Sequence, residues 1–424
     1  MARWLYWLLL AVPLAFLAEF LHWPELLIFV ASAVGLVPLA GLIGMATEEL
    51  AERVGPLVGG LLNATFGNAP ELIIGIVALR AGLLDVVRAS ITGSIIGNTL
   101  LVLGTALLIG GWSKGRQYFD ARNAGQYASM LALAVVGLVL PALANTLGQV
   151  DVTFAHPSGV NIDAISVAFA VILLISYLAY IAYTVFHVRD KPYYEPADAR
   201  ERIVPESEEE GPPLVPPSPV LAEEQQEELE QEAKAARRHR SKSKGSVAAP
   251  SSAGNTPGAS GSHQHASYRK LSFQQLWRPI VLLAGATVAT AIVSELLVGA
   301  IVPVTEQLGW TQLFVGLIIV PIVGNAAEHS SAIQMALKDR VDVSMAITAG
   351  SSIQVALLVA PVLVLVSFLV VQPLDLVFRP LELVIFGLAT FIFPLISLDG
   401  ESTWLEGLLL VAFYVMVGVT VFFL

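Results

Sequence analysis

Two glutamates stand in the same short motif at two distant points of a largely apolar chain. Glu71 ends the segment Gly67–Glu71, Gly-Asn-Ala-Pro-Glu, and Glu328 ends the segment Gly324–Glu328, Gly-Asn-Ala-Ala-Glu. Both acids lie inside apolar stretches, where a carboxylate in the middle of a bilayer costs about 3 kcal/mol or more. Such a residue persists if it is paired, protonated or bound to a cation, so the motif predicts an ion site.

The two acids are expected to meet. Two carboxylates at one point repel each other, and either a proton or a divalent cation relieves that repulsion. The alternative for each acid is a buried hydrogen bond to a neighbouring helix. The repetition of the whole motif favours the ion site over that alternative.

Neutral oxygen atoms near the acids would complete such a site, because Ca2+ takes roughly 6–8 oxygen ligands. The candidates on the same and neighbouring spans are Asn68, Asn325, Ser94, Ser351 and Gln354. Pro70 has no amide hydrogen, so the carbonyl of Phe66 loses its helical partner and becomes a further candidate. Asparagines can instead join helices by hydrogen bonds, and the serines and Gln354 can be packing residues.

The chain has no cysteine, and His329 is the only histidine near the motifs. An oxygen-rich site favours Ca2+, Mn2+ or a monovalent ion over copper or zinc. The candidates for carrying protons are Glu71 and Glu328 themselves, together with Glu48, Glu295 and His329. For Glu48 and Glu295 a snorkelling or salt-bridged side chain is an equal alternative, and His329 can be a helix-packing residue.

Composition places these motifs in a membrane. Of the 424 residues, 55% are hydrophobic and 13% are charged, and the mean hydropathy is +0.72. A soluble domain carries about 25% charge. The apolar stretches predict eleven helical spans, at about 5–22, 25–46, 57–80, 86–111, 124–147, 161–186, 279–303, 310–337, 343–371, 380–397 and 404–424. The first is expected to be a retained helix and not a cleaved signal peptide.

The two motifs belong to a longer internal repeat. Gly59 matches Gly316, and Ser94 matches Ser351, each at the same offset of 257 residues (351 − 94). We therefore expect an all-α polytopic fold with a leading helix (1–24) and two five-helix repeats (25–187 and 277–424). Five is an odd number, so the second repeat is inverted in the membrane, as in secondary transporters with an ion site at the repeat interface.

Residues 188–276 connect the repeats and are hydrophilic throughout. Within them Leu221–Arg240 begins with acidic and ends with basic residues, a charge order that suits a helix macrodipole. We predict a short acidic helix in an otherwise disordered cytosolic connection; the alternative is a plain solvated tether. Lysines and arginines concentrate in the loops on one side, which places the N-terminus and the connection inside and the C-terminus outside.

The motifs resemble those of a known family. Thr47–Leu50 and Gly59–Ile73 look like the first signature of the calcium/proton exchangers (CAX type) of the calcium/cation antiporter superfamily. Gly324–His329 is similar to their second signature, and Gly350–Leu357 to the segment after it. The resemblance covers nearly the whole chain.

The resemblance implies Ca2+/H+ antiport in which Glu71 and Glu328 are alternately bound to Ca2+ and protonated. It implies supporting roles for the neutral residues named above. The sequence departs from the pattern at Pro70, where many members have another small or aliphatic residue, and at Gly97, where a polar residue is common.

Other function classes fit less well. A Na+/Ca2+ or other cation exchanger of the same fold would differ in the driving ion, and a channel would need a continuous pore from several subunits. No enzyme motif is apparent. The expected partners are Ca2+, protons and the lipid bilayer, with no cofactor and no nucleic acid. The expected location is a prokaryotic cell membrane, with a vacuolar membrane as the alternative.

The polar connection is expected to tune exchange without carrying ions, because its residues are hydrophilic and lie outside every predicted span. Deleting residues 206–262 should leave measurable Ca2+ exchange in vesicles, compared with the full chain at equal membrane insertion. Complete loss of exchange in a well-inserted deletion variant would show that the connection is part of the transport mechanism.

Overall fold

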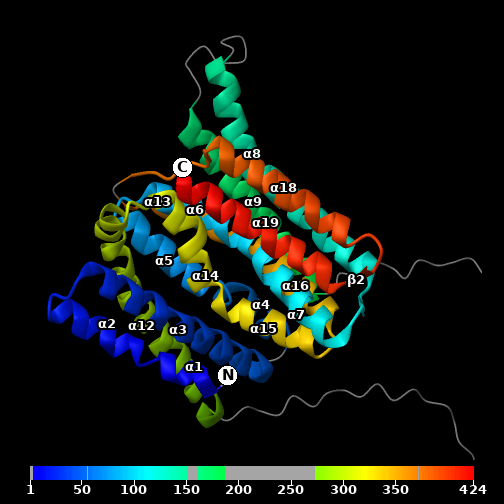
Figure 1. Cartoon of the computed structure of the whole chain (residues 1–424), viewed down its shortest axis with the longest axis horizontal. Helices are drawn as coiled ribbons and strands as arrows, with labels where there is room; N and C mark the ends of the chain where they lie inside the picture. The colour runs from blue at the N-terminus through cyan, green and yellow to red at the C-terminus, as the bar shows by residue number, and fades with distance from the viewer. Residues whose placement is uncertain (1–2, 55, 151–160, 187–272, 371) are drawn as a thin grey trace, which may run out of the picture. The chain divides into compact units, whose positions relative to one another are not determined.

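The structure is a computed structural model of the chain, and it describes residues 3–54, 56–150, 161–186, 273–370 and 372–424. These residues belong to one unit, Met1–Val188 with Lys270–Leu424. The unit is built from helices (Figure 1). The acidic helix predicted at Leu221–Arg240 and most of the 188–276 connection lie outside the described residues.

Each half of the unit supplies a comparable series of helices. The first half contains α1 (Arg3–Leu8), α2 (Ala11–Phe20), α3 (Glu25–Val54), α4 (Pro56–Phe66), α5 (Ala69–Arg80), α6 (Leu84–Ile96), η1 (Gly97–Val102), α7 (Leu103–Lys114), β1 (Gln117–Tyr118), α8 (Ala121–Val150) and α9 (Ile162–Phe186). The second half contains α12 (Phe273–Leu308), α13 (Gln312–Phe314), η2 (Val315–Ile319), α14 (Val320–Gly324), α15 (Ala326–Leu337), α16 (Val341–Gln354), η3 (Val355–Val359), α17 (Ala360–Ser367), α18 (Pro380–Ile396), β2 (Glu401–Ser402) and α19 (Trp404–Phe423). The two short strands pair antiparallel and join the halves.

The Gly-Asn motif interrupts one helix in each half. In the first half α4 ends at Phe66, Asn68 leaves helical geometry (φ −101°, ψ 18°), and α5 begins at Ala69 with Pro70 in its first turn. In the second half Asn325 takes nearly the same geometry (φ −87°, ψ 19°) between α14 and α15. The axis bends by 59° at this second break. The repeat in the sequence is therefore also a repeat in the backbone.

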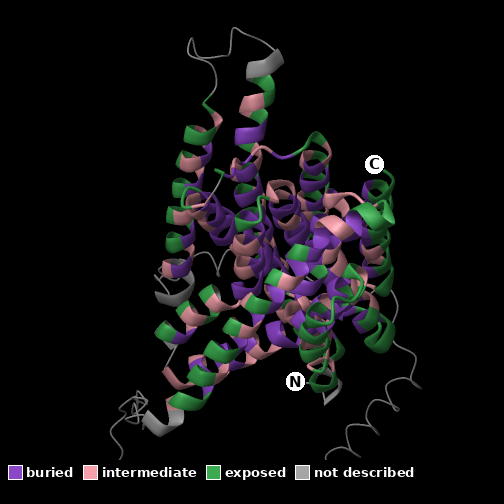
Figure 2. Cartoon of the chain, turned by 90° about the vertical axis from the view of Figure 1, so that its left-hand side faces the viewer, coloured by how far each residue is buried: buried purple, intermediate pink, exposed green. Residues whose placement is uncertain are grey.

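The centre of the unit is formed by one span from each half. Leu84–Lys114 and Val341–Ser367 each have 78% of their apolar stretch inside the protein, and the buried segments gather in the middle of the unit (Figure 2). A Cβ atom on Gly316 would lie 2.8 Å from the carbonyl oxygen of Val86. The backbones of α6 and η2 are thus in contact, an approach that only glycine permits.

The long helices α3 and α12 pack along each other, with α2 against α3 (Figure 1). Apolar residues such as Ile43 and Leu50 on α3 meet Leu283 and Ala286 on α12, and Ala69 at the start of α5 joins this cluster. The two helices therefore border the broken helix α4–α5 from one side.

Most predicted spans have a counterpart in the structure. Among the described residues seven helices are long and apolar enough to cross a membrane, and the bent pair Gln312–Gly324 with Ala326–Leu337 makes an eighth. Tyr6–Phe20 and Pro380–Ile396 are shorter apolar helices, and the predicted span 57–80 is divided into α4 and α5. The prediction of an all-α polytopic membrane protein is confirmed, while the number eleven stays a prediction.

Candidate ion-binding site

The helix breaks place both glutamates at the start of a helix. Glu71 lies in the first turn of α5 and Glu328 in the first turn of α15. The positive end of a helix macrodipole favours a negative charge in this turn. Each break therefore holds one carboxylate in the interior in a position where its ionised form is supported by the backbone.

The carboxylate of Glu71 faces the motif of the other half. Glu71 is 9% exposed, and a Cβ atom on Gly324 would lie 3.5 Å from its Cγ and 3.6 Å from its Oε1. A small cavity is lined by Glu71, Ser94 and Gly324 and by apolar residues around them. Glu328 follows Gly324 by four residues, in the first turn of α15, so both acids lie at the interface of the halves. The structure thus brings the two predicted acids together.

The asparagines of the two motifs reach into the opposite halves. Asn68 donates a hydrogen bond from Nδ2 to Oε1 of Gln354 on α16. Asn325 donates from Nδ2 to Oγ of Ser94 on α6 at 3.1 Å. Both asparagines are 1% exposed. Each broken helix is therefore tied to the central helix of the other repeat.

A third asparagine completes this network. Asn98 is fully buried at the start of η1. Its Nδ2 donates to Oδ1 of Asn325 at 3.2 Å and to Oγ of Ser351 at 2.9 Å. An amide group has two donor hydrogens. Both are therefore engaged, which fixes the orientation of Asn98.

Several buried oxygen atoms at this point have no hydrogen-bond partner. They are Oε1 and Oε2 of Glu71, Oε2 of Glu328, Oδ1 of Asn68 and Oδ1 of Asn98. A buried acceptor without a partner costs about 1–3 kcal/mol, and more if it is charged. These are all hard oxygen donors, the kind that Ca2+ prefers. A bound cation, protons or water would satisfy them.

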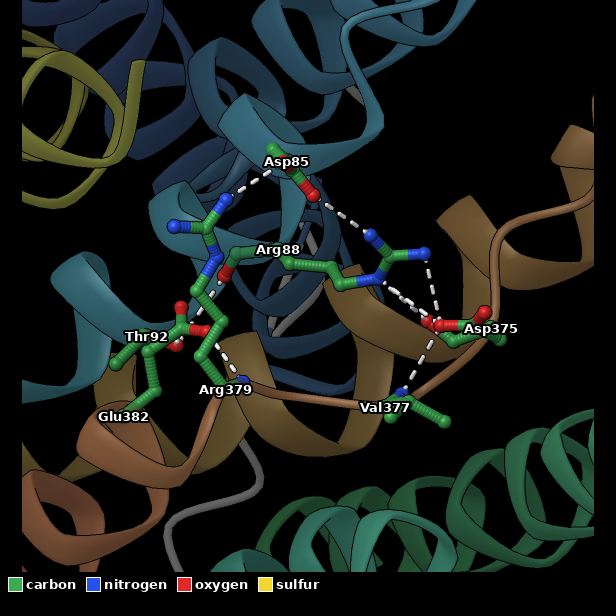
Figure 3. A network of polar contacts seen from close by, with 7 residues as sticks. All are labelled: Asp85, Arg88, Thr92, Asp375, Val377, Arg379 and Glu382. Carbon is green, nitrogen blue, oxygen red and sulfur yellow. Dashed lines mark hydrogen bonds and ion pairs between the residues drawn. The ribbon is translucent and has the colours of Figure 1, made fainter. Parts of the chain in front are cut away.

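A second group of buried and half-buried acids is paired, in contrast to these two (Figure 3). Arg88 bonds to Asp85 at 3.0 Å and to Asp375 at 2.8 Å, and Arg379 bonds to Asp85 at 2.7 Å. Glu382 is 1% exposed and accepts a hydrogen bond from the backbone N–H of Arg379 at 2.8 Å. This network is internally satisfied and leaves no free carboxylate for an ion.

The two halves differ in exposure around the site. Ser331 and Gln334, further along α15, are exposed, and so is Asn63 on α4. The residues at the equivalent positions of Ser331 and Asn63 in the other half, Ile74 and Val320, are buried. Exposed polar side chains on membrane helices face water. We therefore expect access to run along α4 and α15, toward the side predicted to be cytoplasmic.

Comparison with known proteins decides the family. The model of the family described as "Sodium/calcium exchanger protein" matches residues 25–186 and 278–423. The chain belongs to this exchanger family. A Synechocystis protein named Ca(2+)/H(+) antiporter is 40% identical over 98% of this chain and 96% of its own.

Two further comparisons agree. The Bacillus subtilis protein named Ca(2+)/H(+) antiporter ChaA is 34% identical over 97% of both chains. The solved structure of native YfkE superimposes with a TM-score of 0.70 at 31% identity, over 99% of this chain and 100% of that one. The fold of the exchanger is therefore shared along its full length.

Asn98 is the site residue that sequence reasoning did not predict in this exchanger. At the offset of 257, the counterpart of Asn98 is Val355, and that of Gln354 is Gly97. A search for matched polar positions therefore passes over it. The available signal was an asparagine four residues after Ser94, on the same face of an apolar helix.

The other predicted residues lie at different distances from the acid pair. Glu295 on α12 is exposed and bonds to Arg80 at 3.1 Å, so it stands apart from the site. Glu48 is also exposed. It lies one turn beyond Gly44, whose Cβ position is 3.9 Å from Cβ of Ala327, so this part of α3 lies beside the start of α15.

Two predicted residues adjoin the motifs directly. Nδ1 of His329 lies 2.6 Å from the carbonyl oxygen of Asn325, and its Nε2 is buried without a partner. Nδ1 must therefore carry the hydrogen. Phe66 is the last residue of α4, where helix carbonyls lack helical partners. Proton transfer by His329 and ion binding by the Phe66 carbonyl stay predictions.

The one-sided access predicts a difference in thiol labelling, which the absence of native cysteines makes simple to read. Ser331→Cys should react with a membrane-impermeant thiol reagent added to the cytoplasmic side of inverted vesicles. The matched control is Ile74→Cys, the equivalent position of the other half, which is 2% exposed. Equal labelling of the two variants from that side would contradict the predicted access route.

Proposed function

We propose that this exchanger is a secondary active antiporter that moves Ca2+ in exchange for H+ by alternating access. The observation that carries the proposal is the approach of Glu71, from one half, to the motif of Glu328 in the other half, where Oε1 and Oε2 of Glu71 and Oε2 of Glu328 are buried without a partner. The names of the relatives support the choice of Ca2+ and H+. The proposal is transport without catalysis and without a resident cofactor.

The neutral residues divide into two roles in this proposal. Asn68 and Asn98 offer free amide oxygens to the ion. Asn325 and Gln354 have amide oxygens that already accept hydrogen bonds, so they hold the asparagines that bind. Ser94 and Ser351 accept hydrogen bonds in this conformation and retain an oxygen lone pair for the ion.

The described residues contain no group of three or more His, Cys, Asp and Glu side chains with the geometry of a metal site. Two carboxylates with neutral oxygens neutralise one divalent cation without adding a surplus of negative charge. A transported ion must also leave the site again, which a cage with more acids would oppose. The modest charge of the site therefore suits a substrate better than a permanent metal.

Coupling follows from the charge of the pair. Two unit charges 4 Å apart repel by roughly 4 kcal/mol at an effective dielectric constant of 20. One Ca2+ or two protons remove this cost, and an empty ionised pair bears it in full. The site then passes through its closed state only when it holds Ca2+ or protons. Ca2+ moving one way is therefore exchanged for protons moving the other way.

The membrane is proposed to be a prokaryotic cell membrane. The bacterial relative from Bacillus subtilis matches 97% of this chain, and the chain has spans long enough for a bilayer. The predicted orientation then places the open side of the site toward the cytoplasm, where Ca2+ would be loaded for export.

Removing either site charge should stop Ca2+ uptake. Glu71→Gln and Glu328→Gln keep the side-chain volume, and loss of one buried charge partner costs about 3 kcal/mol, or roughly a hundredfold in ion affinity. The measurement is 45Ca2+ uptake into everted vesicles at matched insertion. The control is Glu382→Gln, a buried acid outside the site, which should retain most transport. Substantial uptake by either site variant would sink the paired-acid proposal.

The driving ion is tested by imposed gradients. An inside-acidic gradient should drive Ca2+ into everted vesicles, and a protonophore should stop uptake even when a sodium gradient is present. Uptake should also fall when the Ca2+-loading side is made acidic, because protons compete for the same oxygens. If a sodium gradient alone drives uptake at equal pH, the exchanger couples to sodium and the proton assignment is wrong.

A further inference from the structure

The central spans of both halves contain a π-helical turn directly after the site residues. η1 (Gly97–Val102) follows α6, and η3 (Val355–Val359) follows α16. The offset of 257 places the two turns at equivalent positions. A π turn contains one residue more than an α turn and is frequent at functional sites. It therefore changes the direction of the side chains that follow it.

Asn98 is the second residue of η1, so the start of this turn determines where its amide points. A shift of the turn by one residue would rotate Asn98 away from Asn325 and Ser351, to which both its hydrogens are bonded. It would also move its free Oδ1. The position of the π turn is thus a condition for the site.

Hydroxyl groups from both halves hold the end of α6. Thr99 donates to the carbonyl oxygen of Ile95 at 2.9 Å, and this hydroxyl also lies 3.3 Å from the carbonyl of Ile96. Ser352 of α16 lies 3.3 Å from the same Ile95 oxygen and 3.0 Å from the carbonyl of Thr348. Ser352 is fully buried and Thr99 is 2% exposed.

The contact between Ser352 and Ile95 reflects the symmetry of the two repeats. Their separation is 257 residues, so they occupy equivalent positions of the two repeats. Equivalent residues meet where the two central helices cross. The carbonyl oxygen of Ile95, one turn before Thr99, therefore lies within hydrogen-bond distance of one hydroxyl group from each half.

The equivalent π turn of the second half, η3, has neither an amide side chain nor a hydroxyl group at the matching positions. The counterparts of Asn98 and Thr99 in η3 are Val355 and Ala356. Threonines that bond to their own helix are common in this chain, as Thr105 does with Leu101 at 2.7 Å. Thr99 differs because a second hydroxyl group, that of Ser352, lies beside the same carbonyl oxygen of Ile95. Thr99 also belongs to η1, the π turn that presents an amide to the site.

We propose that Thr99 and Ser352 are positioning residues for ion binding. They hold the last turn of α6, which sets the π turn and aims the amide oxygen of Asn98 at the ion, while they do not touch the ion themselves. The inference rests on the proposed function insofar as the site binds Ca2+. Part of the Ca2+ affinity would then come from the hydroxyl groups of Thr99 and Ser352, which do not contact the ion.

The test measures the Ca2+ dissociation constant of purified full-length protein and, in parallel, KM and Vmax of proton-driven uptake. Thr99→Val and Ser352→Ala should each weaken Ca2+ binding by about fivefold, the effect of one lost hydrogen bond. KM should rise with it while Vmax at saturating Ca2+ changes little. Thr99→Ser, which keeps the hydroxyl, should restore wild-type affinity.

Two controls separate positioning from general destabilisation. Thr105→Val removes an equivalent hydroxyl from α7 and should leave affinity unchanged. Combined with Asn98→Ala, Thr99→Val should add no further loss, because residues that act through one another are not additive. Unchanged affinity in Thr99→Val and Ser352→Ala, or full additivity with Asn98→Ala, would overturn the inference.

The binding measurement also distinguishes this inference from the proposed function. Wild-type protein that binds Ca2+ without proton-driven uptake would refute the antiport proposal, and the variants would still test positioning by their dissociation constants. Wild-type protein that binds no Ca2+ would refute both.

Discussion

The repulsion between two carboxylates that have no permanent partner is the constraint on which the rest of this structure depends. The helix breaks and the asparagine network hold the buried Glu71 and the half-buried Glu328 at one interface, with Oε1 and Oε2 of Glu71 and Oε2 of Glu328 lacking partners. Elsewhere in the unit, buried and half-buried carboxylates have hydrogen-bond or ion-pair partners. Glu382 receives a backbone hydrogen bond, and Asp85 is bonded to two arginines (Figure 3). The absence of such partners at the two glutamates is therefore a specific property of the site.

The broken helices are the means by which the chain holds such an unfavourable pair. An unbroken helix would present each acid from its middle, without the support of a free helix start. The Gly-Asn breaks supply two helix starts in the membrane interior, and the asparagine of each break is bonded to the other half. Broken helices are tolerated at this depth only where they are buried in protein or line a cavity. The site and the fold thus require each other.

Much of this arrangement was predictable from the sequence, because the matching positions of the two repeats are polar residues and glycines, which stand out in an apolar chain. The motif recurs at one offset, which predicted equivalent positions for Glu71 and Glu328. The odd number of expected spans in each repeat predicted that the second repeat is inverted in the membrane. Asn98 was not predictable in the same way, since its counterpart is Val355. Its role depends on the π turn at Gly97, and no local pattern of hydropathy distinguishes a π turn from an α turn. The number of spans is similarly hard to fix where one is divided, as at α4 and α5.

The differences between the halves carry as much information as their likeness. Residues 69–71 are buried, while residues 326–328 are half-buried, although the two segments are nearly the same in sequence. Since their sequences cannot account for the difference, it belongs to the conformation. If the halves exchanged these conformations, α5 would become the exposed path and α15 the sheltered one. The site would then open on the opposite side of the membrane with the same ligands. In the proposed mechanism a single pair of acids therefore serves both sides in turn, because the two motifs have the same chemical groups and differ in how they are packed.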